Sequence, residues 1–367
     1  MLLLVGAVLL LAYANGSNDN FKGVATVYGS GTLPYRGALG LATAAQVVGS
    51  IASVALADAL LKAFSGKGLV PPEVVGDPSF LLAVGVGGAL AVLAATRVGL
   101  PVSTTHALIG GLVGAGLALS QVPLQWGALG AKYLVPLLVS PLLALGAAGV
   151  LYPVARGARR ALGISATTCV CIGQRADPVA VAPDGTMVLA ASGVALTVDE
   201  RQACARVYAG SLAGVSAQPV VNAVHTMSAF ALGFARGLND TPKVLALLVA
   251  AGWSGVHPRV ALAAVAIAMA LGGVLHARRV AETMGHRITR MNCGQGMLAN
   301  TVSSVLVIGA SLLGSPVSTT HVSTGAIFGI GVWTGSADVR VIGGILLAWV
   351  GTLPLAAAIA YLVAWVA

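Results

Sequence analysis

One six-residue stretch, Pro-Val-Ser-Thr-Thr-His, occurs twice in this chain, at residues 101–106 and again at residues 316–321. The copies lie 215 residues apart, and each follows a hydrophobic run and precedes a glycine-rich one. Six identical residues at such a separation indicate an internal duplication. Proline resists the interior of a helix, whereas serine and threonine favour helix N-termini. Each copy therefore predicts a broken hydrophobic segment whose second half-helix begins at the hydroxyl residues.

The composition places this duplication in a lipid bilayer. Of the 367 residues, 57% are hydrophobic and 8% are charged, whereas soluble domains have about 25% charged residues. The net charge of +9 raises nucleic acid as a partner, but basic residues scattered through short loops are better explained by the positive-inside bias. We therefore expect no nucleic-acid partner, and a multi-pass protein in the lipid bilayer of the plasma (inner) membrane.

The duplication also divides the chain into domains. Residues 1–152 form a first membrane repeat and residues 218–367 a second. Residues 153–217 between them are richer in charge, and Pro183-Asp184-Gly185 separates two apolar runs in a pattern typical of a β-hairpin turn. We expect this segment to be a small extramembrane linker, with a regulatory domain as the alternative. The four cysteines match neither a dense disulfide framework nor a metal-binding pattern.

Two corresponding loops differ in charge. The loop 277–290 carries four arginines against Glu282, whereas the loop 65–78 carries Lys67 against two acidic residues. Because basic loops favour the cytoplasmic side, the two repeats are expected to have opposite orientations. Inverted repeats with paired broken helices are typical of secondary transporters, whose site lies near the midplane. The expected fold is an all-α polytopic membrane protein of two inverted-topology repeats with broken or re-entrant helices.

A second duplicated element, Asn-Asp-x-x-Lys, lies upstream of each hexapeptide. Its copies occupy residues 18–22 and 239–243, and we expect the second copy to break its membrane span over residues 236–243. Charged side chains inside membrane segments are costly, so two such copies favour a binding site over two self-neutralising pairs.

The groups at these breaks predict a small oxyanion as the ligand. Hydroxyl groups, half-helix N-termini and two lysines supply hydrogen bonds and positive charge that can replace the hydration shell of an anion. The carboxylates of Asp19 and Asp240 would instead hold a coupling cation or proton, or anchor the lysines. No Walker-type phosphate loop occurs, which disfavours transport driven by ATP on this chain.

The histidines that close the hexapeptides, His106 and His321, allow two interpretations. They are either core side chains bonded to backbone carbonyls, or neutral donors or proton-linked groups. A catalytic pair of Ser103 and His106 is disfavoured, because an i,i+3 spacing at a helix start lacks a strained nucleophile turn. We therefore expect no enzyme. A membrane-embedded hydrolase and a channel-like anion uniporter stay as alternatives.

These residues resemble the inorganic phosphate transporter family, which includes bacterial low-affinity permeases and animal sodium–phosphate symporters. The resemblance covers both repeats and is carried by both hexapeptides, residues 16–19 (Gly-Ser-Asn-Asp), residues 234–240 (Phe-Ala-Arg-Gly-Leu-Asn-Asp) and residues 295–300 (Gln-Gly-Met-Leu-Ala-Asn). It implies a secondary transporter that carries phosphate, or sulfate in some members, coupled to sodium or protons. It also implies a homodimer.

Carried over residue by residue, the resemblance assigns roles to matching positions of this sequence. The expected oxyanion ligands, with the two motif lysines beside them, are Ser103, Thr104, Thr105, Ser318, Thr319, Thr320, Asn18, Asn239, Lys22 and Lys243. The expected residues for a coupling ion or proton are Asp19 and Asp240, to which the chemistry of the hexapeptides adds His106 and His321 as proton-linked candidates.

The chain departs from the family motif Asn-Asp-x-Ala-Asn at its last position. Lys22 and Lys243 stand where the family has an asparagine, whose oxygen can ligate sodium. An ammonium group repels sodium, and beside Asp19 or Asp240 it can occupy the place of a bound cation. We therefore expect no cofactor and a reduced or absent sodium dependence, which leaves proton coupling or exchange. Sodium held by the two aspartates is the alternative.

Overall fold

The structure is a computed structural model that describes residues 2–120, 123–165, 167–181, 183, 187–200, 208–251 and 257–367. The chain divides into two compact units: a membrane unit of Met1–Tyr152 with Thr226–Ala367, and an insert unit of Pro153–His225. Within the described residues, seven helices are long and apolar enough to cross a membrane. The protein is thus an all-α polytopic membrane protein, and its described residues include a small sheet.

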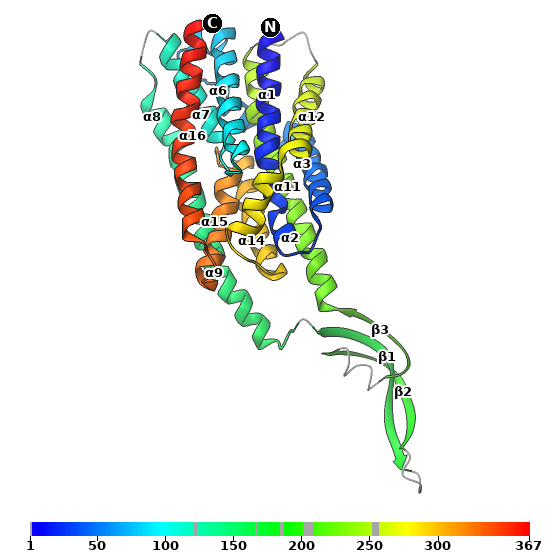
Figure 1. Cartoon of the computed structure of the whole chain (residues 1–367). Helices are drawn as coiled ribbons and strands as arrows, with labels where there is room; N and C mark the ends of the chain where they lie inside the picture. Colours follow the sequence, from blue (N-terminus) through cyan, green and yellow to red (C-terminus); the bar gives the residue numbers. More distant parts are fainter. Residues whose placement is uncertain are drawn as a thin grey trace. The chain divides into compact units, whose positions relative to one another are not determined.

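The elements follow the two repeats in order (Figure 1). The first contains α1 (Leu2–Asp19), a 3-10 turn (Asn20–Val24), α2 (Ala25–Gly29), α3 (Tyr35–Leu56), α4 (Asp58–Ala63), α5 (Pro72–Val75), α6 (Pro78–Arg97), α7 (Thr104–Leu119), α8 (Trp126–Ala128), a π turn (Leu129–Leu134) and α9 (Val135–Ala161). The second contains α11 (Ala217–Ala250), α12 (Pro258–His276), α13 (Arg278–Glu282), a π turn (Thr283–Arg287), α14 (Cys293–Leu312), α15 (Thr319–Thr334) and α16 (Val339–Val366).

Both hexapeptides form the breaks that their residue types predict. Ser103 is extended and accepts a hydrogen bond from the backbone nitrogen of His106 at 3.2 Å, which caps α7. Ser318 caps α15 through the backbone nitrogen of His321 at the same distance. A serine cap satisfies a donor that the first helical turn leaves free, so each half-helix begins directly after the serine.

The break predicted over residues 236–243 is wrong. The helix α11 runs without interruption from Ala217 to Ala250, with Pro242 inside it. In the first repeat, by contrast, α1 ends at Asp19 and a 3-10 turn follows. The polar side chains of α11 find partners on other elements, as described below, so its backbone need not unwind to satisfy them. A membrane helix tolerates the proline when neighbouring groups compensate the lost hydrogen bond.

Glycine pairs show how the repeats interlock. On α7, Gly110 and Gly114 pack against α16, and a Cβ on Gly114 would come within 2.0 Å of the Ala357 carbonyl oxygen. On α15, Gly325 and Gly329 pack against α9 in the same way. The two pairs are separated by the same 215 residues as the hexapeptides. Each half-helix therefore packs on the last long helix of the other repeat, at a closeness that only glycine permits.

The two half-helices begin at a common point. Thr320 donates its hydroxyl to the Val102 carbonyl at 2.9 Å, and Thr105 donates to the Val317 carbonyl at 3.4 Å. From this meeting point α7 and α15 extend toward opposite ends of the helical bundle (Figure 1). Opposed half-helices with facing N-termini are the arrangement expected of inverted repeats.

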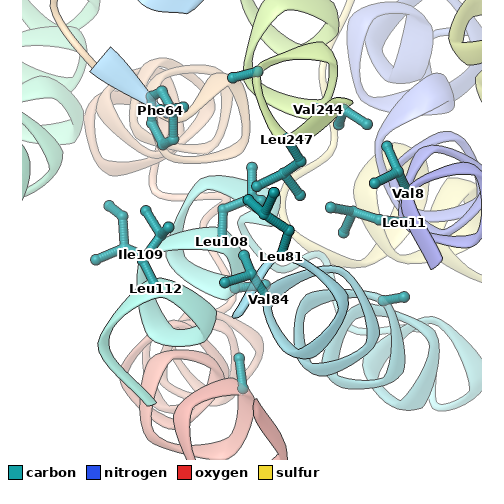
Figure 2. Packing of buried hydrophobic residues seen from close by; sticks show 14 of the residues in the cluster. Val8, Leu11, Phe64, Leu81, Val84, Leu108, Ile109, Leu112, Val244 and Leu247 are labelled. Atoms are coloured by element: carbon teal, nitrogen blue, oxygen red, sulfur yellow. The ribbon is translucent and has the colours of Figure 1, made fainter. Parts of the chain in front are cut away.

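Apolar side chains surround α7 and fill the space between it and its neighbours. Figure 2 shows this cluster, to which α1, α6, α7 and α11 contribute. Its labelled members are Val8, Leu11, Phe64, Leu81, Val84, Leu108, Ile109, Leu112, Val244 and Leu247. In a bilayer such a core is stabilised by dispersion and close fit more than by removal from water. It fixes the start of α7 against α1 and α11, which carry the Asn-Asp-x-x-Lys elements.

The insert unit contains a three-stranded antiparallel sheet in the order β2-β1-β3. Its strands are β1 (Thr168–Val181), β2 (Met187–Glu200) and β3 (Tyr208–Ser216). Val181 pairs with Met187, so β1 and β2 are consecutive antiparallel strands. The turn predicted at residues 183–185 lies mostly outside the described residues. This unit extends to His225, eight residues beyond the predicted linker.

Candidate functional site

The start of both half-helices, the end of α1 and the middle of α11 enclose a buried polar cluster. All fourteen site residues predicted from the sequence are buried, and the most accessible of them, His106, is 9% exposed. Buried polar groups need hydrogen-bond partners, and in a membrane protein these partners must come from the protein itself.

Lys22 connects the two repeats. Its ammonium forms a salt bridge with Asp19, three residues earlier, and donates to the Val102 carbonyl at 2.6 Å. The third hydrogen bond, of 2.7 Å, reaches the hydroxyl of Thr320 in the second repeat. An ammonium group has three donors, so these three partners satisfy it completely.

Lys243 makes the equivalent contacts from the second repeat to the first. Its ammonium lies 3.4 Å from Asp240 Oδ1 and donates to the Val317 carbonyl at 2.8 Å. Its third partner, also at 2.8 Å, is the hydroxyl of Thr105 in the first repeat. Each lysine thus contacts the aspartate and the hexapeptide carbonyl of its own repeat and a threonine of the other. We call Lys22, Thr320, Lys243 and Thr105 the lysine clamp.

Two side chains that the sequence analysis missed join the carboxylates. Asn15 Nδ2 lies within hydrogen-bonding distance of Asp19 at 2.9 Å, of Thr104 at 3.1 Å and of Asp240 at 3.3 Å. Its Oδ1 accepts from Arg236 Nη2 at 2.6 Å. Asn15 and Arg236 precede the two aspartates by four residues, a spacing that places them on the same helical face. That spacing was a signal available in the sequence.

The cluster holds more positive than negative charge. Its charged groups are Lys22, Lys243 and Arg236 against Asp19 and Asp240, which leaves a formal excess of one positive charge. Arg236 Nε lies 3.8 Å from Asp240 Oδ2, and this nitrogen atom has no hydrogen-bond partner within the described part of the chain. An unbalanced buried charge costs several kcal/mol, roughly, so an anion at this point would stabilise the cluster.

A narrow pocket, which we call the anion pocket, lies where this excess charge meets the start of α15. Lys22 and Arg236 line it together with the hydroxyl residues Thr319 and Ser323. A guanidinium, an ammonium and hydroxyls at a helix N-terminus form an environment suited to an oxyanion. In this conformation the pocket is too narrow for a water molecule, so an anion requires its walls to separate.

The predicted asparagines support the breaks and do not line this pocket. Asn18 donates to Thr96 at 2.8 Å and to the Leu100 carbonyl at 3.0 Å, and it accepts from the backbone nitrogen of Val102 at 3.0 Å. Asn239 donates to the Val317 carbonyl at 3.2 Å. Both side chains thus hold the extended residues in front of the half-helices.

The remaining predicted residues fall into two groups. Ser103 and Ser318 are helix caps, while His106 and His321 meet each other with ring centroids 4.6 Å apart. His321 also stacks on Trp349 at 3.7 Å. Neither histidine lines the anion pocket, and Nδ1 of His106 has no hydrogen-bond partner among the described residues. The structure therefore brings both histidines together beside the cluster.

Comparisons with known proteins show which family this chain belongs to. A family model described as the phosphate transporter family matches residues 15–360. A probable low-affinity inorganic phosphate transporter of Mycobacterium tuberculosis is 29% identical over 97% of this chain and 75% of its own length. A putative phosphate permease of Pyrococcus furiosus is 26% identical over 95% of this chain and 92% of its own.

A solved structure described as the sodium-dependent phosphate transporter has the same fold. It aligns with a TM-score of 0.76 and 20% identity, over 100% of this chain and 98% of its own. The family match spans both repeats, both hexapeptides and the buried cluster. The chain therefore belongs to the phosphate transporter family and is a multi-pass membrane transport protein, not an enzyme.

Proposed function

We propose that this protein is a secondary transporter that moves inorganic phosphate across the plasma membrane by alternating access. The observation that carries the proposal is the double role of Lys22. Its ammonium lines the anion pocket with Arg236 and also holds Thr320 of the opposite repeat. A phosphate that draws hydrogen bonds from Lys22 therefore weakens a contact between the repeats. Substrate binding and movement of the repeats are coupled through this one group.

Phosphate is the favoured substrate, and the names of the relatives support it over sulfate. Near neutral pH phosphate keeps a proton and can donate a hydrogen bond, whereas sulfate cannot. Asp19, which pairs with the pocket lysine, would accept that hydrogen bond. Competition of phosphate uptake by sulfate measures the preference directly. Equal competition by the two anions would contradict it.

For coupling, we propose protons in place of sodium. Both aspartates that would attract sodium already pair with lysines, so a sodium ion must displace an ammonium group. A proton on Asp19 or Asp240 removes the charge that holds the lysine and so loosens the lysine clamp. His106 and His321 are the alternative carriers of the coupling proton, because their rings lie together, with centroids 4.6 Å apart, at the starts of the two half-helices.

Uptake of labelled phosphate into proteoliposomes tests the function. We expect saturable uptake that a proton gradient stimulates and that exchange of sodium for potassium leaves unchanged. Counterflow of labelled against unlabelled phosphate should be observed, because a carrier that releases one phosphate can bind another on that side of the membrane and carry it back. Strong stimulation by a sodium gradient would overturn the proposed coupling. Flux that does not saturate and shows no counterflow would identify a channel-like uniporter.

A further inference from the structure

A second pocket, separate from the central cluster, carries three lysines. It has a volume of about 480 Å³, and Lys62, Lys67 and Lys132 line it together with Ser315 and other residues. The lysines come from α4, from the loop after α4 and from the π turn before α9. Ser315 lies just before the second hexapeptide, so both repeats contribute to the wall. We call this pocket the lysine vestibule.

The lysine vestibule has an excess of positive charge. Lys62 pairs with Asp58 at 2.6 Å, while no carboxylate residue is among those that line the pocket. The ammonium of Lys132 lies beside the loop that carries Lys67. A Cβ atom added to Gly68 in that loop would lie 3.6 Å from Lys132 Nζ. All three lysine side chains are exposed. Ammonium groups do not face hydrocarbon, so this pocket opens to water at the membrane surface.

A pair of aromatic side chains lies between the lysine vestibule and the lysine clamp. Tyr133 lines the vestibule and packs edge-on against Phe64, with ring centroids 5.8 Å apart. The ammonium of Lys243 lies over the Phe64 ring, 5.6 Å from its centroid. Phe64 is only 1% exposed and belongs to the core cluster (Figure 2). Two aromatic rings, Tyr133 and Phe64, thus connect the vestibule surface to Lys243 of the clamp.

The second hexapeptide forms another connection between the vestibule and the clamp. Pro316 lines the lysine vestibule, and the carbonyl of the next residue, Val317, accepts the hydrogen bond from Lys243. A small displacement of this extended segment would therefore change the vestibule and the clamp together.

We infer that the lysine vestibule is an outer binding site that recruits the free oxyanion before it passes Phe64 to the central pocket. This inference rests on the proposed transport of phosphate. Clustered charge in a hollow raises the local concentration of a counter-ion and its association rate by about tenfold to a thousandfold. The phosphate of a lipid headgroup has the same chemistry, but the connection through Tyr133 and Phe64 to Lys243 favours an anion in transit.

Thiol modification tests the site without requiring transport. In Ser315→Cys, we expect an anionic methanethiosulfonate reagent to react several times faster than a cationic one. The unsubstituted chain reports the background from natural cysteines. Replacing Lys62, Lys67 and Lys132 with glutamine should abolish this preference. Millimolar phosphate should slow the reaction, whereas chloride at equal ionic strength should not. An anionic phospholipid that protects where free phosphate fails would overturn the inference.

Transport kinetics provide the second test. The triple variant K62Q/K67Q/K132Q should raise KM for phosphate about threefold to tenfold and leave the maximal rate unchanged. The matched control R156Q/R159Q/R160Q removes three exposed positive charges from the insert unit. Equal KM values in the two triple variants would overturn the inference. Absence of uptake by the unsubstituted protein would instead contradict the proposed function, and thiol modification would still decide the question of the outer site.

Discussion

The ammonium of Lys22 lies 2.7 Å from the hydroxyl of Thr320, a residue 298 positions further along the chain. The equivalent contact of Lys243 with Thr105 is 2.8 Å long and runs in the opposite direction between the repeats. These two contacts pin the starts of both half-helices to the opposite Asn-Asp-x-x-Lys element. A rocking movement of one repeat against the other must break at least one of them. The lysine clamp is therefore a natural point of control for alternating access.

Replacing both lysines with asparagine tests whether they stand in for a cation. In Lys22→Asn with Lys243→Asn, the two aspartates lose their ammonium partners and gain an amide oxygen. We expect phosphate uptake to become sodium-dependent or to be lost, because the carboxylates then need a free cation. Uptake is measured in proteoliposomes with sodium or potassium outside. Arg340→Asn, at an exposed position, is the control. Uptake that is near normal and indifferent to sodium would show that the lysines are bystanders.

Local signals in the sequence predict much of the fold. Proline followed by Ser-Thr-Thr specifies the start of α7 and of α15, because the serine cap and the proline act within one turn. The exception is α11, which continues through Pro242. The side chains of Arg236 and Lys243 are satisfied by distant partners, and no local pattern reports whether such partners exist. Propensity predicted a break that tertiary contacts made unnecessary.

The candidate site was predicted in its composition more than in its contacts. Duplication marked the residues that gather at the centre, and all of them are buried there. The role of each residue depends on which repeat its side chain contacts. Thr105 and Thr320 were expected beside the anion, yet they bind lysines of the opposite repeats. Such pairing between residues hundreds of positions apart is fixed by the inverted packing of the repeats.

The clamp threonines should contribute to stability as well as to transport. In Thr105→Val or Thr320→Val, a buried ammonium loses one acceptor while the volume of the side chain stays nearly the same. We expect each substitution to lower the free energy of unfolding by about 1–3 kcal/mol. Thermal unfolding in detergent measures the effect. Thr324→Val is the matched control on α15, because its hydroxyl contacts the Met284 sulfur only at 4.0 Å. Equal Tm values for Thr320→Val and this control would contradict the clamp.

Arg236 should set the affinity for the anion. It lines the anion pocket and supplies the positive charge in excess of the two aspartates. Removing that charge in Arg236→Gln should lower kcat/KM for phosphate uptake about tenfold to a hundredfold, roughly the strength of one charge-assisted hydrogen bond. The kcat/KM of Arg236→Lys should lie between those of Arg236→Gln and the unsubstituted protein, because lysine keeps the charge but lacks the planar donor pair of arginine.

Stability must be separated from affinity for this variant. Size-exclusion profiles and Tm values in detergent show whether Arg236→Gln is folded. Arg278→Gln, which removes an exposed charge beside Tyr35, controls for a general loss of basic residues. A folded Arg236→Gln protein with kcat/KM within twofold of the unsubstituted chain would place the anion elsewhere.

The carboxylates of Asp19 and Asp240 should carry the coupling proton. Asp19→Asn and Asp240→Asn each imitate a permanently protonated aspartate, so a proton gradient has nothing left to act on at that position. We expect these variants to lose stimulation by the gradient while phosphate–phosphate exchange continues, since exchange requires no net proton movement. His106→Gln with His321→Gln should keep the stimulation, because among the described residues neither ring hydrogen-bonds a clamp lysine or lines the anion pocket. Uptake with and without an imposed pH difference, together with counterflow, distinguishes the two sets. Loss of stimulation in the histidine pair alone would transfer the coupling proton to His106 and His321.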